Sequence, residues 1–276
     1  PIPPGEIDPP ASPFYGLAPT AQGPEQLVKL QAILHQLIQS EGLERIKPQI
    51  LPTAKPAIQI ELLPEPVLGI PTGESKIGGD PDLPTEFPWP EWHGRPMGFI
   101  AQFNLASASQ YDLLGLLPKE GLLSFFYDLV DQPWGYDPDN LGYSHVAYFP
   151  PGTQLHRRAA PDPEIRLKCS DVLFSASLTL PVWGSRDYDA LEAATGLSGK
   201  ETDQYDLLVT HLQDATRQRQ GASFHRLLGH SHNVQGDMQL EAELVTNGIY
   251  CGDTTGYQSP RRQQLEPQAA DWLLLF

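Results

Sequence analysis

Three histidines near the end of the chain could hold a metal ion. His225, His230 and His232 fall within eight residues, and Asp237 follows them closely. Imidazole and carboxylate groups on one loop can ligate zinc or a related metal. However, the spacing His-x4-His-x-His matches none of the established metal-binding motifs. We therefore interpret the three as hydrogen-bonding loop histidines and predict no resident metal. A metal-dependent hydrolase that uses this loop is the alternative.

A second set of residues could form a ligand-binding site, and it consists of Gly78, Gly79, Asp80, Trp89, Gln102 and Asn104. Glycines tolerate a positive φ and let another backbone approach, and an aspartate after them can close the turn. If these residues line one concavity, amide groups would lie between aromatic walls, as in many small-molecule or peptide sites.

Gln102 decides between two interpretations of this site. It interrupts the apolar run GFIAQFNLA, and strand alternation places it on one face with Ile100 and Asn104, opposite Phe99, Ala101 and Phe103. In the first interpretation it points away from the core and contacts a ligand. In the second it hydrogen-bonds the backbone of the Gly-Gly-Asp loop and fixes that loop.

Residues 81–96 connect the two parts of this site and contain five prolines. Prolines keep the segment extended at low entropic cost, so Phe87, Trp89 and Trp92 can be pressed against a sheet. We interpret the segment as a rigid aromatic clasp. The alternative is an aromatic-lined groove for a peptide or another extended ligand.

Several carboxylates gather in the segment DLVDQPWGYDPDN, namely Asp128, Asp131, Asp137 and Asp139, together with Asn140. Calcium needs several oxygens from one loop, but this segment lacks the ligand spacing of an EF-hand. Asp-Pro and Asp-Asn pairs are typical of turns. We predict a solvated turn, with calcium binding as the alternative.

Neither cysteine is placed like a nucleophile. Cys169 lies in the alternating run Ile165-Leu167-Cys169, which is typical of a core-facing position, and no basic residue adjoins Cys251 to lower its pKa. Two cysteines do not make a disulfide framework. The chain contains no G-x-S-x-G elbow, no G-x-G-x-x-G and no phosphate-binding loop. The sequence therefore predicts no catalytic residue and no cofactor.

The elements that would position these residues begin with a helix. Residues 1–23 are proline-rich and predict an extended arm. Within residues 24–48, one apolar stripe at helical spacing predicts an amphipathic helix that begins at Pro24 and ends near Gly42. The stripe consists of Leu27, Leu30, Leu34, Leu37 and Ile38.

The remaining residues, 49–276, predict an α+β domain with a mixed, mostly antiparallel sheet and flanking helices. Ile58, Ile60 and Leu62 alternate with polar residues, which is typical of a half-buried strand. Strand-like runs begin at Gly98, Gly121 and Tyr143, and turn-rich links between them favour antiparallel neighbours. One or two strands follow within 164–183, then a helical insertion at about 187–219, with Leu207, Leu208, His211 and Leu212 on or near the inner face of its second helix. Beyond residue 224 we expect Gly-rich loops.

The composition restricts the partners. The chain has 276 residues, 29 prolines and 24 glycines, which excludes long helical bundles, and its 34 acidic and 18 basic residues give a net charge of −16. Such a surface repels nucleic-acid phosphates and anionic lipid and favours cations or basic proteins. No stretch of eighteen apolar residues predicts a membrane span. We therefore expect a cytoplasmic protein without nucleic-acid or membrane partners.

Ordered motifs in the first half of the domain resemble the YwqG-like family, a bacterial family of unknown function. They are SKIGGDPDLPTEFPWP, GFIAQFNL, LPKEGLLSFFYD and DQPWGYDP, and the later HRLLGHSHNVQGDM and WLLLF are similar to the family's second half. The resemblance covers roughly residues 75–276. It implies a mixed α+β domain with an internal duplication.

In this duplication, residues 76–80 would correspond to 226–230, and residues 99–102 to 273–276. The second copy would then be incomplete and would leave an open sheet edge near Phe276, available to another chain. With no reactive motif, we expect a non-catalytic binding protein that captures a basic protein or peptide. Neutralisation of a basic toxin is one version of this role.

Overall fold

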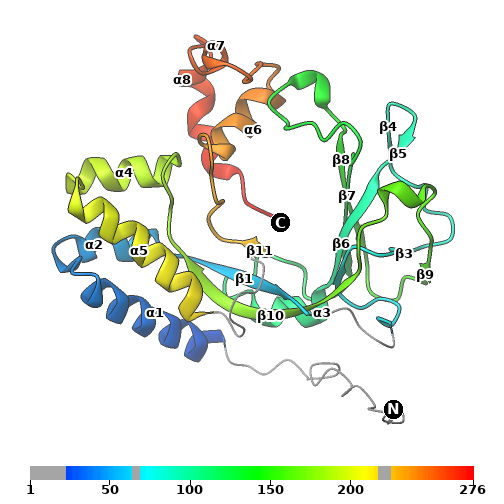
Figure 1. Ribbon diagram of the computed structural model, residues 1–276, viewed down its shortest axis with the longest axis horizontal. Helices are drawn as coiled ribbons and strands as arrows, with labels where there is room; N and C mark the ends of the chain where they lie inside the picture. Colours follow the sequence, from blue (N-terminus) through cyan, green and yellow to red (C-terminus); the bar gives the residue numbers. More distant parts are fainter. Residues whose placement is uncertain (1–22, 64–68, 217–224) are drawn as a thin grey trace, which may run out of the picture.

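The computed structural model describes residues 23–63, 69–216 and 225–276 (Figure 1). The arm predicted for residues 1–23 lies outside this part of the chain, except for its last residue. The described residues form an α+β fold around one curved antiparallel sheet, as the sequence predicted. No helix within them is long and apolar enough to cross a membrane.

The main sheet has seven strands in the order β11-β1-β10-β2-β6-β7-β8, and every neighbouring pair is antiparallel. The strands are β1 (Lys55–Leu62), β2 (Lys76–Ile77), β6 (Gly98–Asn104), β7 (Leu122–Tyr127), β8 (Ser144–Phe149), β10 (Ser170–Thr179) and β11 (His225–Leu228). The prediction that the runs from Gly98 and Gly121 form adjacent antiparallel strands is confirmed by the pairing of β6 with β7.

Short elements lie between these strands. Two ribbons pair β3 (Asp82–Leu83) with β9 (His156–Arg157) and β4 (Glu91–Trp92) with β5 (Arg95–Pro96). The connecting segments also contain α3 (Leu105–Ala108), η3 (Ser109–Tyr111), η4 (Pro138–Asn140) and η5 (Pro163–Ile165).

The sheet bends, with β1 and β10 at its base and β6, β7 and β8 rising at one side (Figure 1). The end of the chain lies inside this curve, where the Phe276 ring packs on the rings of Phe103 and Phe125. The ring centroids lie 5.0 Å and 5.1 Å apart, respectively. The inner face is therefore the face that carries Phe103 and Phe125.

Two expectations about strand faces were wrong. Strand β1 is buried on both faces, because Gln59 and Glu61 are each 1% exposed, so it is a central strand rather than a half-buried one. In β6 a register shift between Phe99 and Ala101 marks a β-bulge, so Phe99 packs in a different core cluster from Ala101 and Phe103. Simple alternation cannot place the faces of a strand that contains a bulge.

Helices pack against the C-terminal part of β10. They are α1 (Gly23–Ser40), α2 (Lys47–Ile50), α4 (Arg186–Thr195) and α5 (Lys200–Ala215), with η1 (Glu44–Ile46) and η2 (Leu51–Thr53) between α1 and β1. The predicted stripe of α1 is confirmed, since Leu30, Leu34 and Ile38 are buried against α5 and β10. The two helices of the predicted insertion form as expected over 186–215, and Gly196 ends α4 in the left-handed conformation. On α5, however, Leu207 and His211 are exposed, and the inner face carries Tyr205, Leu208, Val209 and Leu212.

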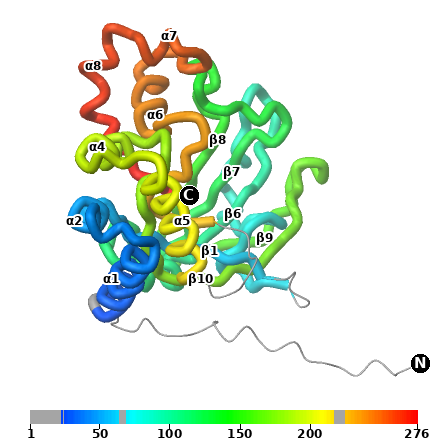
Figure 2. The backbone as a smooth tube through the Cα atoms, turned by 60° about the vertical axis from the view of Figure 1, so that its left-hand side comes forward, coloured from blue at the N-terminus to red at the C-terminus, as the bar shows by residue number. Residues whose placement is uncertain are grey.

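The chain after β11 forms helices where loops were expected. They are α6 (Met238–Thr246), α7 (Thr254–Tyr257), α8 (Arg262–Leu265) and η6 (Glu266–Asp271), and we call residues 238–271 the helical cap. The cap has its own small core of Leu240, Leu244, Cys251 and Ala269. In Figures 1 and 2 it lies above the curved sheet, between α4 and the segment that joins β7 to β8. Helices this short leave too few apolar repeats for periodicity to reveal them.

The internal duplication is not supported. Residues 273–276 form no strand, so the second copy lacks the counterpart of β6. The resemblance is local: Gly78–Gly79 and Leu228–Gly229 are both consecutive residues with positive φ. The N–H groups of Gly78 and Leu228 also donate to Ile100 O and Leu274 O, which the proposed alignment pairs. The similar turns do not extend to a repeated unit.

Candidate functional site

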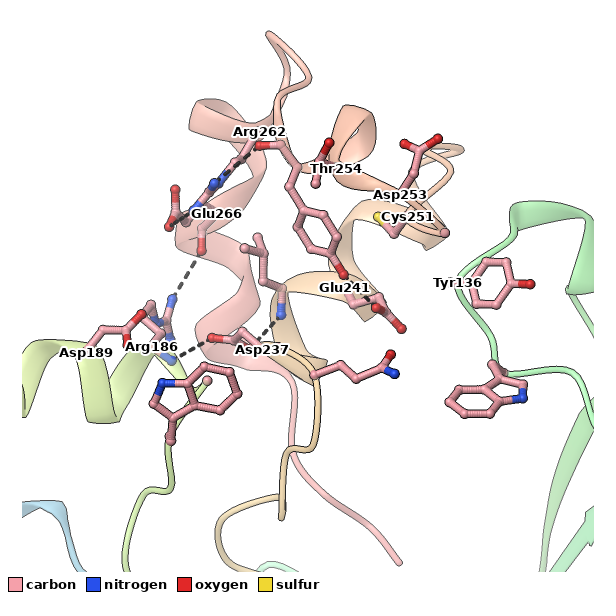
Figure 3. Close-up of a pocket in the computed structure, with 18 residues that line it drawn as sticks. Tyr136, Arg186, Asp189, Asp237, Glu241, Cys251, Asp253, Thr254, Arg262 and Glu266 are labelled. Atoms are coloured by element: carbon pink, nitrogen blue, oxygen red, sulfur yellow. Dashed lines mark hydrogen bonds and ion pairs between the residues drawn. The ribbon is translucent and has the colours of Figure 1, made fainter. Parts of the chain in front are cut away.

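A cavity separates the helical cap from two segments of the sheet domain, residues 134–136 and 183–189. We call it the cap cleft, and its volume is ≈ 760 Å³. In Figure 3, Tyr136 lies on one side, Arg186 and Asp189 lie on the other, and cap residues such as Glu241 and Asp253 lie between them. Its walls therefore come from three distant parts of the chain.

Exposed aromatic side chains line the cleft. Trp134 and Trp183 are 75% and 63% exposed, which is unusual for the side chain with the largest apolar surface. Tyr136 is also exposed. Its ring packs edge to face on the ring of Tyr250, a residue of the cap, with 5.6 Å between the ring centroids. The hydrophobic core does not use these tryptophans, so they are free to contact a ligand.

The charge of the cleft is negative. Its lining contains the five carboxylates Asp189, Asp237, Glu241, Asp253 and Glu266, against the two guanidinium groups of Arg186 and Arg262. Both guanidiniums are engaged by the protein: Arg186 Nη1 donates to Glu266 O at 3.1 Å, and Arg262 Nη1 donates to Tyr257 O at 3.2 Å. Arg262 also pairs with the Glu266 carboxylate at 3.3 Å. The two guanidiniums hold the cap in place and offset two of the five carboxylates, so the lining keeps a formal charge of −3.

Two of the carboxylates are fixed by helix capping. Asp237 accepts hydrogen bonds from Leu240 N (3.0 Å) at the start of α6 and from Arg186 N (2.8 Å) across the cleft. Asp253 caps α7 through Thr255 N at 2.8 Å. Aspartates are favoured at such positions because they accept from helix N–H groups that would otherwise lack partners.

Glu241 and Cys251 form the inner part of the cleft. Tyr257 Oη donates to Glu241 Oε2 at 2.6 Å, and burial together with this hydrogen bond raises the pKa of Tyr257. Burial, and then the charge of Glu241, raises the pKa of Cys251 to about 11. Since a thiol attacks as its thiolate, this cysteine is protonated at neutral pH and poorly suited to nucleophilic chemistry.

Backbone packing places the Cys251 loop against the sheet domain. Cys251 N donates to Tyr136 O at 2.8 Å. The next residue is glycine for a steric reason, because a Cβ at Gly252 would lie 2.8 Å from Tyr136 Cδ2 and 2.2 Å from Tyr250 Oη. This close contact joins the cap to the segment that carries Trp134 and Tyr136.

The residues of the predicted ligand site lie elsewhere. Gln102 is fully buried, its Oε1 accepts from Asp82 N at 2.9 Å, and its Nε2 donates to Asp82 Oδ2 (2.6 Å) and Glu74 O (2.7 Å). Asp82 also binds Lys76 at 3.0 Å and Arg157 at 2.7 Å. Burial alone would raise the pKa of Asp82, but Arg157 and Lys76 outweigh burial and lower it. Gln102 thus belongs to a buried ionic network, and its backbone partners, Glu74 and Asp82, flank the Gly-Gly-Asp loop rather than belong to it.

The other predicted ligand residues are also held by the protein. A Cβ at Gly78 would lie 2.2 Å from Lys168 O, and one at Gly79 would lie 2.9 Å from Cys169 Sγ. Asp80 pairs with Arg166 at 2.8 Å. Asn104 caps α3 by accepting from Ala106 N at 3.0 Å, and its Nδ2 donates to Gly73 O at 3.1 Å. None of them lines the cap cleft, so their role in ligand binding stays a prediction.

Trp89 behaves as the predicted clasp. It is half-buried, its Nε1 donates to Met97 O at 2.8 Å, and its ring packs edge to face on Phe126 at 5.8 Å. Phe87 packs in the same way on Phe149 at 5.0 Å. Both rings extend the core cluster of Phe99 and Phe126, so the segment covers the sheet.

The three histidines do not converge. His230 is buried, and its Nε2 lies 2.7 Å from Thr53 O. His225 and His232 line a separate cavity of ≈ 540 Å³. Across the described residues, no group of three or more His, Cys, Asp or Glu side chains is arranged to hold a metal ion. The geometry therefore gives the alternative hydrolase no metal centre on this loop.

The carboxylates of the 128–140 segment act in turns. Asp128 accepts from Asp131 N at 2.9 Å, and Asp137 accepts from Asp139 N at 2.9 Å. Asp131 instead pairs with Arg95. Within this segment, Trp134 and Tyr136 line the cleft, although the sequence did not indicate them as site residues. The feature of the sequence that could have indicated them is a pair of aromatic residues on either side of Gly135 in a turn-rich segment.

A family model described as a domain of unknown function, DUF1963, matches residues 75–276. This match covers most of the chain, and the chain therefore belongs to that family. No curated protein matches the chain. The YwqG-like name suggested by the sequence motifs stays a prediction.

Proposed function

We propose that this member of a family of unknown function is a binding module whose cap cleft captures lysine or arginine side chains of a basic protein or peptide. The observation that carries the proposal is the combination of two exposed tryptophans with an excess of carboxylates in one cleft. A basic toxin would be one partner of this kind.

The charge of the cleft supports a cationic ligand. Five carboxylates against two guanidiniums leave the lining with a formal charge of −3, and the whole chain carries a net charge of −16. Complementary charge steers a basic partner toward such a surface and raises the association rate. The negative charge of the cleft would repel an anionic ligand.

The aromatic side chains add a specific attraction for cations. A lysine ammonium or an arginine guanidinium over a tryptophan face gains about 0.5–2 kcal/mol from the ring quadrupole. The aliphatic part of the same side chain can pack on the exposed indole. A cleft volume of ≈ 760 Å³ lies in the common range for ligand sites.

Peptide titrations test the proposal. A lysine-rich fluorescent peptide should bind, and a glutamate-rich peptide of equal length should not. Trp183→Ala and Glu241→Gln should each weaken binding by roughly three- to tenfold, because each removes an interaction of about 1 kcal/mol.

Matched controls separate the cleft from total charge and total apolar surface. Glu44→Gln removes one exposed carboxylate far along the chain from the cleft lining, and Leu114→Ala removes an apolar side chain that is 54% exposed. Both should leave affinity unchanged. If Glu44→Gln weakens binding as much as Glu241→Gln, only general charge attracts the peptide and the proposed site is wrong.

A further inference from the structure

Strand β8 is an edge of the main sheet, and among the described residues nothing pairs with its outer side. Asp128 N donates to Tyr143 O at 2.9 Å, in register with the β7–β8 ladder. Hydrogen-bonding residues alternate along an antiparallel strand, so His145, Ala147 and Phe149 direct their backbone groups toward β7. Ser144, Val146 and Tyr148 therefore direct their N–H and C=O groups outward.

The exposure of these residues agrees with this assignment. Ser144 is exposed, and Val146 and Tyr148 are 47% and 44% exposed, whereas Ala147 is 5% exposed. No described residue forms a hydrogen bond with the backbone groups of Ser144, Val146 or Tyr148 on the outer side. These groups are an available template for another strand.

Strand β8 also lacks the features that usually protect an edge. Its sequence SHVAYF contains no lysine, no acidic residue and no proline, although the chain as a whole carries a net charge of −16. The pairing with β7 runs without a bulge. Natural proteins block exposed edges with charges, prolines or bulges, so an unblocked edge is a candidate docking surface.

The edge leads directly into the cap cleft. Tyr143 precedes β8, and a Cβ at Gly135, between Trp134 and Tyr136, would lie 2.6 Å from Tyr143 Oη. Trp134 and Tyr136, on either side of Gly135, both line the cap cleft. The β8 edge and the cleft are thus parts of one continuous surface.

We infer that an extended segment of the basic partner adds to β8 as an antiparallel strand and delivers the basic residues that follow it into the cap cleft. The inference rests on the proposed function and extends it. Antiparallel pairing is the arrangement throughout this sheet, and it brings the C-terminal end of the added segment to Tyr143. Main-chain hydrogen bonds would supply affinity, and the cleft would supply specificity, as in other cases of strand addition.

The geometry also restricts which residue types the partner segment can carry. Val146 and Tyr148 are cross-strand partners of Phe125 and Leu123, so their side chains lie on the inner face of the sheet. Partner residues that share this face would contact Val146 and Tyr148 and should be apolar or β-branched. About five residues span Ser144 to Tyr148, and the basic residues should follow immediately.

The sequence predicted an open sheet edge near Phe276, and the second edge strand of this sheet is β11. There, Leu228 N of β11 donates to Leu274 O at 3.1 Å, so the final segment of the chain already covers part of that edge. The accessible edge is β8, which the proposed duplication did not indicate.

The test uses a peptide of about seven residues, alternating threonine and valine and ending in two lysines, with fluorescence anisotropy as the readout. A second peptide carries N-methyl groups on alternate backbone amides, which removes strand pairing but keeps every side chain and charge. The unmodified peptide should bind the wild-type protein at least about tenfold more tightly than the methylated one, since more than one main-chain hydrogen bond is lost.

Val146→Pro tests the same point on the protein. It removes one outward N–H without touching the β7 ladder, and edge strands tolerate proline at such positions. It should weaken the unmodified peptide by about tenfold and leave the weak binding of the methylated peptide unchanged. In NMR spectra of the wild-type protein, the Val146 amide should exchange more slowly with solvent once the unmodified peptide is bound.

The outcomes separate the two proposals. If both peptides bind equally and Glu241→Gln still weakens them, strand addition is wrong and the cleft proposal stands. If neither peptide binds, the proposed function is wrong. If the protein dimerises through β8, so that Val146→Pro gives monomers and peptide affinity does not change, a second copy occupies the edge and the inference is overturned.

Discussion

The buried carboxylate of Asp82 provides the sharpest test of how this fold is stabilised. Asp82 Oδ2 accepts from Lys76 Nζ at 3.0 Å, Gln102 Nε2 at 2.6 Å and Gly73 N at 3.0 Å, and Oδ1 accepts from Arg157 Nε at 2.7 Å. Asp82 is 0% exposed and Lys76 is 0% exposed. Within the described residues, Asp82 is the one hydrogen-bond partner of the Lys76 ammonium. The two members of this ion pair should therefore respond very differently to substitution.

Asp82→Asn leaves the buried ammonium of Lys76 without a counter-charge and next to the positive Arg157. Breaking a buried pair in this way costs about 3–5 kcal/mol. Lys76→Met removes the ammonium and fills a similar volume, while Asp82 keeps its bonds from Arg157, Gln102 and Gly73. We expect this second substitution to cost only about 1 kcal/mol, the usual size of one hydrogen bond.

Urea unfolding followed by circular dichroism measures both changes, because the free energy of unfolding is linear in denaturant concentration. In thermal unfolding of the same variants, Asp82→Asn should lower Tm by roughly 10 °C and Lys76→Met should lower it by a few degrees. The double variant should be more stable than Asp82→Asn alone, since it removes the uncompensated charge. If Lys76→Met proves the more damaging of the two single substitutions, Asp82 does not organise this network and the reasoning is refuted.

Three further predictions concern single residues. Gly229→Ala should destabilise the protein by about 3 kcal/mol, since Gly229 has φ +78° and an added Cβ would lie 2.7 Å from Thr179 Oγ1. The control is Gly199→Ala, at φ +54° with no atom within 4 Å of the added Cβ, and it should cost about 1 kcal/mol in the same urea assay. Burial lowers the pKa of His230 to about 4, so the unfolded chain takes up its proton first. The free energy of unfolding should therefore decrease by about 3 kcal/mol as the pH falls from 6.5 to 4. His230→Gln should flatten this part of the pH profile. An unchanged profile would contradict the assignment. Cys251 should react with a thiol reagent more slowly than the half-buried Cys169 in native protein, and equal native rates would show that the Cys251 thiol is accessible.

Local patterns predicted a substantial part of this fold. The apolar stripe from Leu27 to Ile38 fixes the buried face of α1, because the spacing of side chains on a helix is a property of the helix itself. The adjacent strands β6 and β7 followed from two alternating runs joined by a turn-rich link. The Pro-rich clasp over the sheet followed from proline stiffness and aromatic content, both of which are local.

What sequence reasoning missed depends on contacts between distant segments. The bulge near Ile100 reverses the face of Phe99, and Gln102 is buried because Asp82 and Glu74 reach it from another loop. Trp134 and Trp183 are exposed and line the cleft beside the cap, and no local pattern contains that information. The cap cleft could not be predicted for the same reason, since three separate parts of the chain form its walls.

The helical cap has a thermodynamic consequence for any ligand of the cleft. Four buried residues form its core, so it is the natural unit for sub-global opening, in which one part of a protein unfolds while the sheet persists. Such opening would remove one wall of the cleft and abolish binding below the global melting temperature. By mass action, a ligand that bridges the cap and the segment of Trp134 would favour the closed state. Occupancy of the cleft would then be reported by slower amide exchange throughout α6, including amides that no ligand touches.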